Sequence, residues 1–183
     1  LDDPARGDLE IRIVSKDKDL EQLLGPRVSM FDVHTDVTID VAALLANKGI
    51  TPEQVVDTLT LIGDTVDNVP GVPGVGEKTA AKWIREFGSL DALVDRVDEV
   101  KGKAGDALRE HLPNVLRNRQ LTELRRDVQL PVGPHDLHLG QWDREEVHKL
   151  FDTLQFRVLR ERLYQTLQAV EPEADEGFEL EGS

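Results

Sequence analysis

The sequence contains no cysteine among its 183 residues, and this absence removes several classes of site. Disulfide bonds, thiolate zinc sites and cysteine nucleophiles are all excluded. Aromatic residues make up only 4% of the chain, and no run of about 18 apolar residues offers a candidate membrane span. The first residues also lack the basic and apolar regions of a signal peptide. We therefore expect a cytoplasmic protein without a membrane segment.

Positive charge is scarce too, since 22 basic residues face 36 acidic ones and the net charge is −14. Such a balance argues against a nucleic-acid partner unless the basic residues are clustered. Residues 1–73 carry 6 basic and 14 acidic groups, whereas residues 74–126 carry 11 and 9. An acidic metal site beside a basic nucleic-acid-binding segment would explain this pattern. An uneven distribution of surface charge would explain it as well, and composition alone favours this second explanation.

The apolar pattern predicts a mixed α/β chain of ordinary globular composition, large enough to bury a core. Residues 11–14 read as a short buried strand, and residues 28–33 as a second one with a hairpin partner at 37–39. Thr51 followed by Pro52 marks a helix start. That helix should end near Gly63 and bury one face, made of Val55, Val56, Leu59 and Ile62.

Prolines and glycines exclude a helix at residues 68–76, and helical patterns follow that segment. We expect a helix at 77–87 closed by Gly88, and a short one capped by Ser89 with Leu90 and Leu93. Residues 103–122 look helical in two pieces, broken at Pro113.

The last third of the chain is predicted from weaker patterns. Residues 128–131 should be extended, and residues 143–169 should form two helices. Their inward side chains would be Leu150, Leu154, Leu159 and Leu163. From residue 171 onward the composition is acidic and poor in large apolar residues, which is typical of a disordered linker.

Two pairs of aspartates stand at the ends of predicted elements. Asp17 and Asp19 lie where the strand at 11–14 ends and a helix would begin. In open α/β sheets, ligands bind beyond the carboxyl ends of strands. Asp64 and Asp67 follow the end of the next long helix, and their separation lets both side chains point the same way if the turn is helical.

Four carboxylates in one place would repel one another, and some would protonate unless cations neutralised them. Mg²⁺ or Mn²⁺, hard cations with oxygen ligands, are the natural match. Two such ions about 4 Å apart activate a water and stabilise the leaving oxygen of a phosphodiester. The alternative is structural, since Asp17 or Asp19 could cap a helix and Asp64 or Asp67 could serve a turn. For either pair in isolation the structural alternative is the stronger.

A glycine-rich segment at residues 71–82, GVPGVGEKTAAK, comes next. Gly74 and Gly76 allow backbone conformations closed to other residues, so amide groups at a helix N-terminus could approach a phosphate. Lys78 and Lys82, one turn apart, would add positive charge to the same face. Such contacts position a nucleic-acid backbone without reading its sequence. A tight connection between packed helices with solvated lysines is the structural alternative.

Together these segments resemble the 5′ nuclease family, the 5′→3′ exonuclease and flap endonuclease domain of bacterial DNA polymerase I. Residues 15–20, SKDKDL, are similar to its aspartate motif, and residues 63–71, GDTVDNVPG, to its G-D-x-x-D-N-x-P-G motif. Residues 74–80, GVGEKTA, are similar to its helix-hairpin-helix. The likeness extends through residues 124–127 and 156–159, and it covers about residues 9–170.

The resemblance implies a partial PIN-like nuclease sheet followed by a mainly helical region with a helix-hairpin-helix. It implies two-metal hydrolysis of DNA in replication and repair, with catalytic and metal-binding roles for Asp17, Asp19, Asp64 and Asp67. DNA-binding roles are implied for Gly74, Val75, Gly76, Lys78, Thr79 and Lys82. Relatives also bind K⁺ at this hairpin through backbone carbonyls, for which Val72 and Val75 are the candidates here.

The resemblance also divides the chain, with the nuclease core at 1–62 and the acidic motif and hairpin at 63–126. A C-terminal strand and helices would occupy 127–170, and an acidic linker to polymerase domains 171–183. The family supplies further active-site residues from an N-terminal half that this chain lacks. We therefore expect weak or no cleavage by the chain alone. The resemblance further implies a monomer that binds duplex DNA with a 5′ flap or nick.

Two other interpretations stay open. The chain could be a binding module, in which the hairpin grips DNA and the aspartates are idle, or it could belong to a stand-alone nuclease. Trp83 and Trp142 are expected in the core rather than as platforms for stacked bases.

Overall fold

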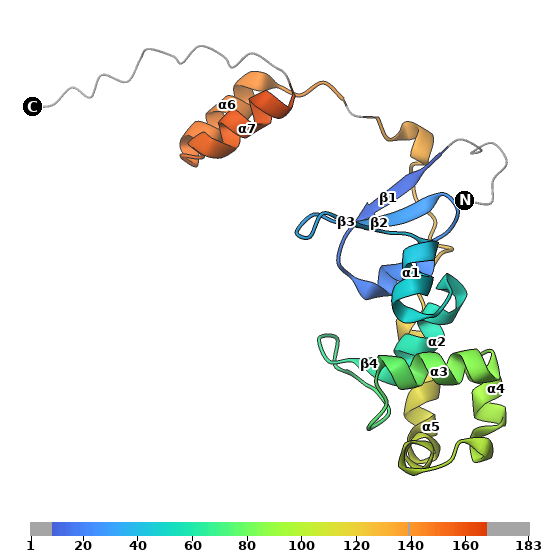
Figure 1. Cartoon of the computed structure of the whole chain (residues 1–183). Helices are drawn as coiled ribbons and strands as arrows, with labels where there is room; N and C mark the ends of the chain where they lie inside the picture. The colour runs from blue at the N-terminus through green and yellow to red at the C-terminus, as the bar shows by residue number, and fades with distance from the viewer. Residues whose placement is uncertain (1–8, 139, 168–183) are drawn as a thin grey trace, which may run out of the picture. The chain divides into compact units, whose positions relative to one another are not determined.

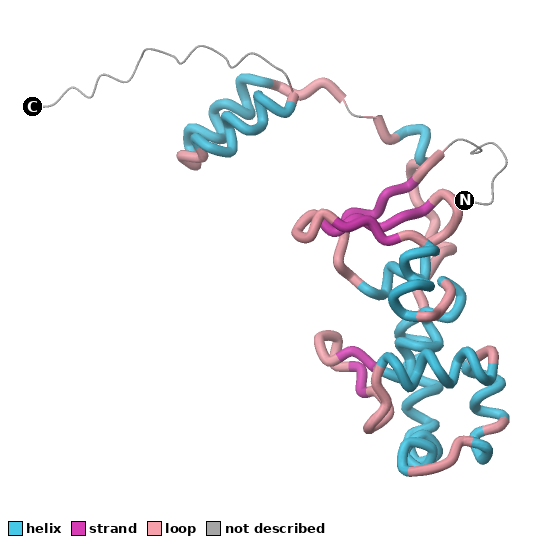
Figure 2. The backbone as a smooth tube through the Cα atoms, viewed as in Figure 1, coloured by secondary structure: helices cyan, strands magenta, loops and turns pink. Residues whose placement is uncertain are grey.

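The computed structural model describes residues 9–138 and 140–167, and they divide into two compact units at residues 127 and 128. The expected acidic linker at 171–183 lies outside the described residues. Within the described residues, no helix has both the length and the apolar character needed to cross a membrane. Figures 1 and 2 show the helices and strands of the two units.

The first unit begins with a three-stranded sheet in the order β1-β2-β3. Its elements are β1 (Ile11–Val14), the 3₁₀ helix η2 (Lys18–Leu23), β2 (Val28–Asp32) and β3 (Val37–Ile39). β1 pairs parallel to β2, and β2 pairs antiparallel to β3. The expected strands and the hairpin are confirmed, but β1 is only half-buried, with Val14 61% exposed. Side chains of β1 alternate between the core and the open face of the sheet.

Helices make up most of the remaining secondary structure of the first unit, as Figure 1 shows. They are α1 (Val41–Lys48), α2 (Pro52–Ile62), α3 (Glu77–Phe87), α4 (Leu90–Asp95), η3 (Val97–Glu99) and α5 (Lys103–Thr122). A two-stranded ribbon of β4 (Gly63–Asp64) and β5 (Val69–Pro70) follows α2.

The predicted helix ends are confirmed where capping residues marked them. Thr51 precedes α2, and its backbone N–H donates to the Gln54 side chain at 3.1 Å. Gly88 ends α3, with its N–H donating to the Ile84 carbonyl. Ser89 Oγ accepts from Ala92 N–H at the start of α4. Such local hydrogen bonds satisfy backbone groups that a helix end leaves unpaired.

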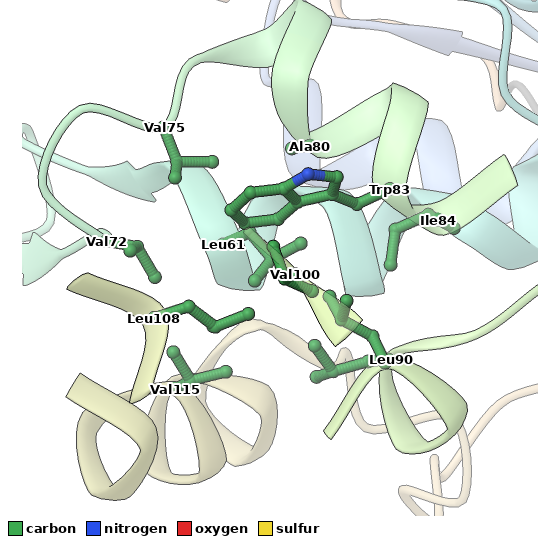
Figure 3. Close-up of a cluster of buried hydrophobic side chains, with 11 residues drawn as sticks. Leu61, Val72, Val75, Ala80, Trp83, Ile84, Leu90, Val100, Leu108 and Val115 are labelled. Atoms are coloured by element: carbon green, nitrogen blue, oxygen red, sulfur yellow. The ribbon is translucent and has the colours of Figure 1, made fainter. Parts of the chain in front are cut away.

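Two hydrophobic clusters form the core, and α2 and α3 contribute to both. The first contains Trp83, Ile84, Leu90, Leu93, Leu108 and Val115, together with Leu61 of α2. Figure 3 shows Trp83 among these side chains, with Leu108 and Val115 of α5 nearby, so its expected core position is confirmed. The second cluster joins Met30 of the sheet and Leu44 of α1 to Val55 and Leu59 of α2. Of the expected face of α2, Val55, Val56 and Leu59 are buried and Ile62 is half-buried.

The expected break at Pro113 is wrong, because α5 is one continuous helix with Pro113 inside it. A proline inside a helix removes one N–H bond to the preceding turn, and its ring crowds the carbonyl four residues earlier, at a cost of about 3 kcal/mol. Pro113 is exposed, while Leu108 and Val115 are buried on either side of it. Packing of both halves against the first cluster therefore outweighs the lost hydrogen bond.

The second unit holds η4 (Pro134–Asp136), α6 (Arg144–Thr153) and α7 (Arg157–Thr166). The two helices are confirmed, but the strand expected at 128–131 is absent from this described segment, where no neighbouring strand pairs with it. The expected inward leucines are also wrong, since only Leu163 is half-buried and three are exposed, namely Leu150, Leu154 and Leu159. Tyr164 is buried instead, and its ring centroid lies 5.7 Å from that of Trp142.

We predict that Leu108→Ala destabilises the chain by roughly 2–5 kcal/mol, because it leaves a cavity where a fully buried side chain packs. Urea unfolding followed by circular dichroism measures this free energy. Leu116→Ala is the matched control in the same helix, since Leu116 is 50% exposed. Equal losses for the two variants would contradict the described core.

Candidate functional site

The first aspartate pair follows β1, at the carboxyl end of a parallel strand. Asp17 is exposed and caps η2, with its Oδ1 accepting from Asp19 N–H at 3.0 Å. Asp19 lies in the first turn of η2 and is half-buried. The capping role considered for Asp17 is therefore present, and it orients the turn that carries Asp19.

The second pair lies on the ribbon that follows α2. Asp64 Oδ1 accepts from Val66 N–H at 2.8 Å and more weakly from Asp67 N–H at 3.4 Å. This is the turn-forming role considered for Asp64. Asp64 is half-buried and Asp67 is exposed.

Two glycines bring the ends of this ribbon into direct backbone contact. A Cβ on Gly71 would lie 1.9 Å from the Ile62 carbonyl oxygen, and one on Gly63 would lie 2.2 Å from the Gly71 nitrogen. Gly63 also has a φ of 75°. No other residue type fits both positions, so the ribbon carrying Asp64 and Asp67 is fixed at the end of α2.

Three of the four predicted aspartates face one pocket of about 310 Å³. It is lined by Lys18, Asp19, Leu59, Gly63, Asp64, Asp67, Val69, Leu121 and Thr122. Asp17 does not line it, although its charge acts on Asp19. The two aspartate pairs therefore lie on the same side of the first unit, from segments more than 40 residues apart in the sequence.

Lys18 balances part of the negative charge, with its Nζ 2.9 Å from Asp64 Oδ2. Hydrogen bonds from Lys18 and from Val66 N–H hold the pKa of Asp64 below its ordinary value. One oxygen of Asp64 thus holds the turn and the other holds a lysine.

Asp19 shows the opposite effect. Burial, followed by the charges of Asp17 and Asp64, raises the pKa of Asp19 above its ordinary value, and Asp67 adds to this while Lys18 opposes it. The carboxylates at this pocket are therefore only partly neutralised by protein groups, and a cation would relieve the remaining repulsion.

The donor set suits a hard divalent cation, because it consists of carboxylate oxygens. The charge imbalance at Asp19 fits such an ion as well. Over the described ranges, however, no three Asp, Glu or His side chains are close enough together to hold a metal ion by themselves. Within the described residues, the pocket therefore offers carboxylate oxygens but no closed set of three potential ligands.

The glycine-rich segment leads into α3, whose first residues are exposed. Gly74 has a φ of 77°, as expected for a position that favours glycine, whereas Gly76 is extended at −107° and needs no special conformation. Of the two glycines, only Gly74 adopts a conformation that other residues disfavour. Val75 is buried in the first cluster, which anchors the loop. Lys78 and Lys82 are exposed one turn apart, and Thr79 is half-buried.

Sequence reasoning missed three residues of this pocket. Lys18 stands between two singled-out aspartates, and that position was its only signal. Leu121 and Thr122 belong to the last turn of α5, more than 50 residues beyond Asp67, and no local pattern marks them.

The chain is similar in sequence and fold to proteins of known function. The family model described as "5'-3' exonuclease, C-terminal SAM fold" matches residues 50–145. That range contains Asp64, Asp67 and the glycine-rich segment, but it begins after Asp17 and Asp19. DNA polymerase I of Mycobacterium tuberculosis is 50% identical over 177 residues, covering 94% of this chain and 20% of its own length.

Two further relatives point the same way. DNA polymerase I of Bacillus subtilis is 37% identical over 175 residues, covering 93% of this chain and 20% of its own length. The flap endonuclease of bacteriophage T5, solved as a complex with DNA and metal ions, has 27% identity and a TM-score of 0.58. That alignment covers 62% of this chain and 42% of the T5 chain. The chain spans about a fifth of the length of the curated relatives it matches.

We predict that Gly71→Ala destabilises the chain by roughly 1–3 kcal/mol or more, since its methyl group would collide with the backbone of Ile62. Gly25→Ala is the matched control, because a Cβ there meets nothing within 4 Å. Thermal unfolding of both variants is the measurement. A Gly71→Ala variant as stable as Gly25→Ala would mean that the ribbon is not closed in this way.

Proposed function

The chain belongs to the 5′-3′ exonuclease family, and we propose that it is part of a 5′→3′ exonuclease and structure-specific flap endonuclease acting on DNA. The activity would be phosphodiester hydrolysis in replication and repair, within a longer protein of the DNA polymerase I kind. The observation that carries the proposal is the pocket in which Asp19, Asp64 and Asp67 meet.

The predicted metal ligands are the two aspartate pairs, Asp17 with Asp19 and Asp64 with Asp67. Their carboxylates suit Mg²⁺ or Mn²⁺, with two ions in the complete site. When bound, such ions supply an activated water and stabilise the charge on the leaving oxygen. The protein residues hold this charge in place: the Asp17 cap orients Asp19, and the Asp64 turn orients Asp67.

The proposed DNA contacts lie at the start of α3. Gly74, Val75 and Gly76 shape the loop, and Lys78, Thr79 and Lys82 follow on the helix. Contacts there would reach the phosphate backbone, so they would hold a duplex with a flap or nick without reading its sequence. K⁺ binding through the carbonyls of Val72 and Val75 belongs to the same proposal. The Val72 carbonyl already accepts from Val75 N–H at 3.0 Å, which leaves it one lone pair for an ion.

The negative net charge does not oppose DNA binding at this place. Exposed charges act over a screening length of about 8 Å at physiological ionic strength, so the local balance decides. The segment from 74 to 126 has a net charge of +2, with 11 basic and 9 acidic residues.

The wider assignments are part of the same proposal. They are the division of the chain at residues 62, 126 and 170, a monomeric state, a cytoplasmic location, and a polymerase region beyond the acidic tail. The missing ligands would come from the N-terminal half of the nuclease domain, so the isolated chain should cleave weakly or not at all.

We predict that Asp64→Asn and Asp67→Asn in the longer protein each lower the cleavage rate about 100-fold or more, since each removes a charged metal ligand worth several kcal/mol. Flap cleavage with saturating Mg²⁺ measures the rate, and gel shift without metal measures DNA binding. Binding should be retained. Unchanged cleavage in both variants would favour the binding-module interpretation instead.

We also predict that Lys78→Gln and Lys82→Gln weaken DNA binding at every sequence. Each should reduce the slope of log K against log salt by about 1, the value for one lost phosphate contact. Lys149→Gln is the control, because this exposed lysine lies on α6, outside residues 74–126. Equal slopes for the three variants and the parent would refute the proposed phosphate contacts of Lys78 and Lys82.

A further inference from the structure

The last two turns of α5 contact both segments that carry the aspartates. Leu121 and Thr122 line the pocket itself, between the η2 side and the ribbon side. Two buried amide side chains make the connections, Gln22 on η2 and Asn118 on α5. They are 3% and 2% exposed, and neither belongs to any motif that marks the family resemblance.

Gln22 ties η2 to the end of α5. Its Nε2 donates to the Thr122 carbonyl at 3.1 Å, and its Oε1 accepts from Leu124 N–H at 3.0 Å. Arg126 adds a bond to the Gln22 backbone carbonyl at 2.8 Å. Since η2 also carries Asp19, these bonds fix one wall of the pocket against α5.

Asn118 ties the ribbon to the same helix one turn earlier. Its Nδ2 donates to the Pro70 carbonyl at 2.7 Å and lies 3.4 Å from the Thr60 carbonyl. Pro70 pairs with Gly63 in the ribbon, next to Asp64. The second wall of the pocket is therefore fixed against α5 as well.

A neighbouring interaction gives a comparison. Arg119 Nε donates to Asp57 Oδ1 at 3.1 Å and so ties α5 to α2, while its Nη1 donates to Glu123 Oε2 at 2.9 Å at the end of α5 itself. On this turn of α5, Asn118 thus bonds to the ribbon, whereas Arg119 bonds to α2.

We propose that Gln22 and Asn118 are positioning residues that use α5 as a common support to set the separation between Asp19 and the Asp64–Asp67 pair. This inference rests on the proposed metal-dependent function. Ligands of a metal site have to be held within about 0.5 Å of their productive positions. Three carboxylates that repel one another would otherwise move apart, and the two amides oppose that movement from opposite walls.

The test uses Gln22→Met and Asn118→Leu in the longer protein, both close in volume to the native side chains but unable to make the bonds. Arg119→Met is the matched control for lost packing, and Asp64→Asn is the reference for lost catalysis. Mn²⁺ affinity is measured by electron paramagnetic resonance on folded samples. The kcat and KM for a flap substrate, and the melting temperature, are measured alongside.

The positioning role predicts that Gln22→Met and Asn118→Leu weaken Mn²⁺ binding and lower kcat by about 10–100-fold, the usual effect of losing a residue that orients metal ligands. KM for DNA should change less than twofold. Arg119→Met should lower the melting temperature and leave Mn²⁺ affinity and kcat unchanged. If Gln22→Met does not fold, Gln22→Asn keeps the polar group but is too short for both bonds, and the same losses are expected.

Variants that melt earlier but bind Mn²⁺ and cleave like the parent would overturn the inference, and so would equal losses in Arg119→Met. Failure of the proposed function is a separate result: Asp64→Asn would then cleave normally. Loss of cleavage in Asp64→Asn together with unchanged Gln22→Met and Asn118→Leu rejects the positioning role alone.

Discussion

Repulsion of Asp19 by the neighbouring carboxylates of Asp17, Asp64 and Asp67 is the constraint that the surrounding structure has to meet. Like charges at one pocket favour separation or protonation, and Lys18 offsets them through its ion pair with Asp64. The remaining resistance comes from the scaffold. α2 and α3 contribute side chains to both hydrophobic clusters, so the sheet side and the helical side of the first unit are packed as one body. The two walls of the pocket cannot separate without disturbing that packing.

The structural and chemical roles of the aspartates are compatible because a carboxylate has two oxygens. Asp17 caps η2 and Asp64 holds its turn, which are the ordinary roles of aspartate at such positions. In Asp64 the second oxygen faces Lys18 in the pocket. The local hydrogen bonds therefore orient the charges rather than compete with them. In an aspartate that serves a cap or a turn, one oxygen fixes the orientation of the carboxylate, and the other oxygen can still interact with a cation.

The features that the sequence could predict are governed by near neighbours. Thr51, Gly88 and Ser89 act on backbone groups within one turn, so the ends of α2, α3 and α4 follow from them directly. Short apolar segments likewise indicated the three strands of the sheet. The helix break predicted at Pro113 is wrong because the local cost of the proline is outweighed by the burial of Leu108 and Val115. That burial depends on residues distant in the sequence.

The features of the candidate site also divide into those set by near neighbours and those set by residues distant in the sequence. Its aspartates could be found because each pair follows an element end, while their meeting in one pocket depends on how α2 and the sheet pack. Gln22 contacts residues about 100 positions away, and its hydrogen bonds serve a helix end that no pattern near Gln22 reveals. A buried amide is costly unless both of its polar atoms are satisfied. The partners of Gln22 at the end of α5 must therefore stay at fixed distances from it. Because Gln22 and Asp19 lie on the same short helix, these bonds would also fix the position of Asp19 relative to α5.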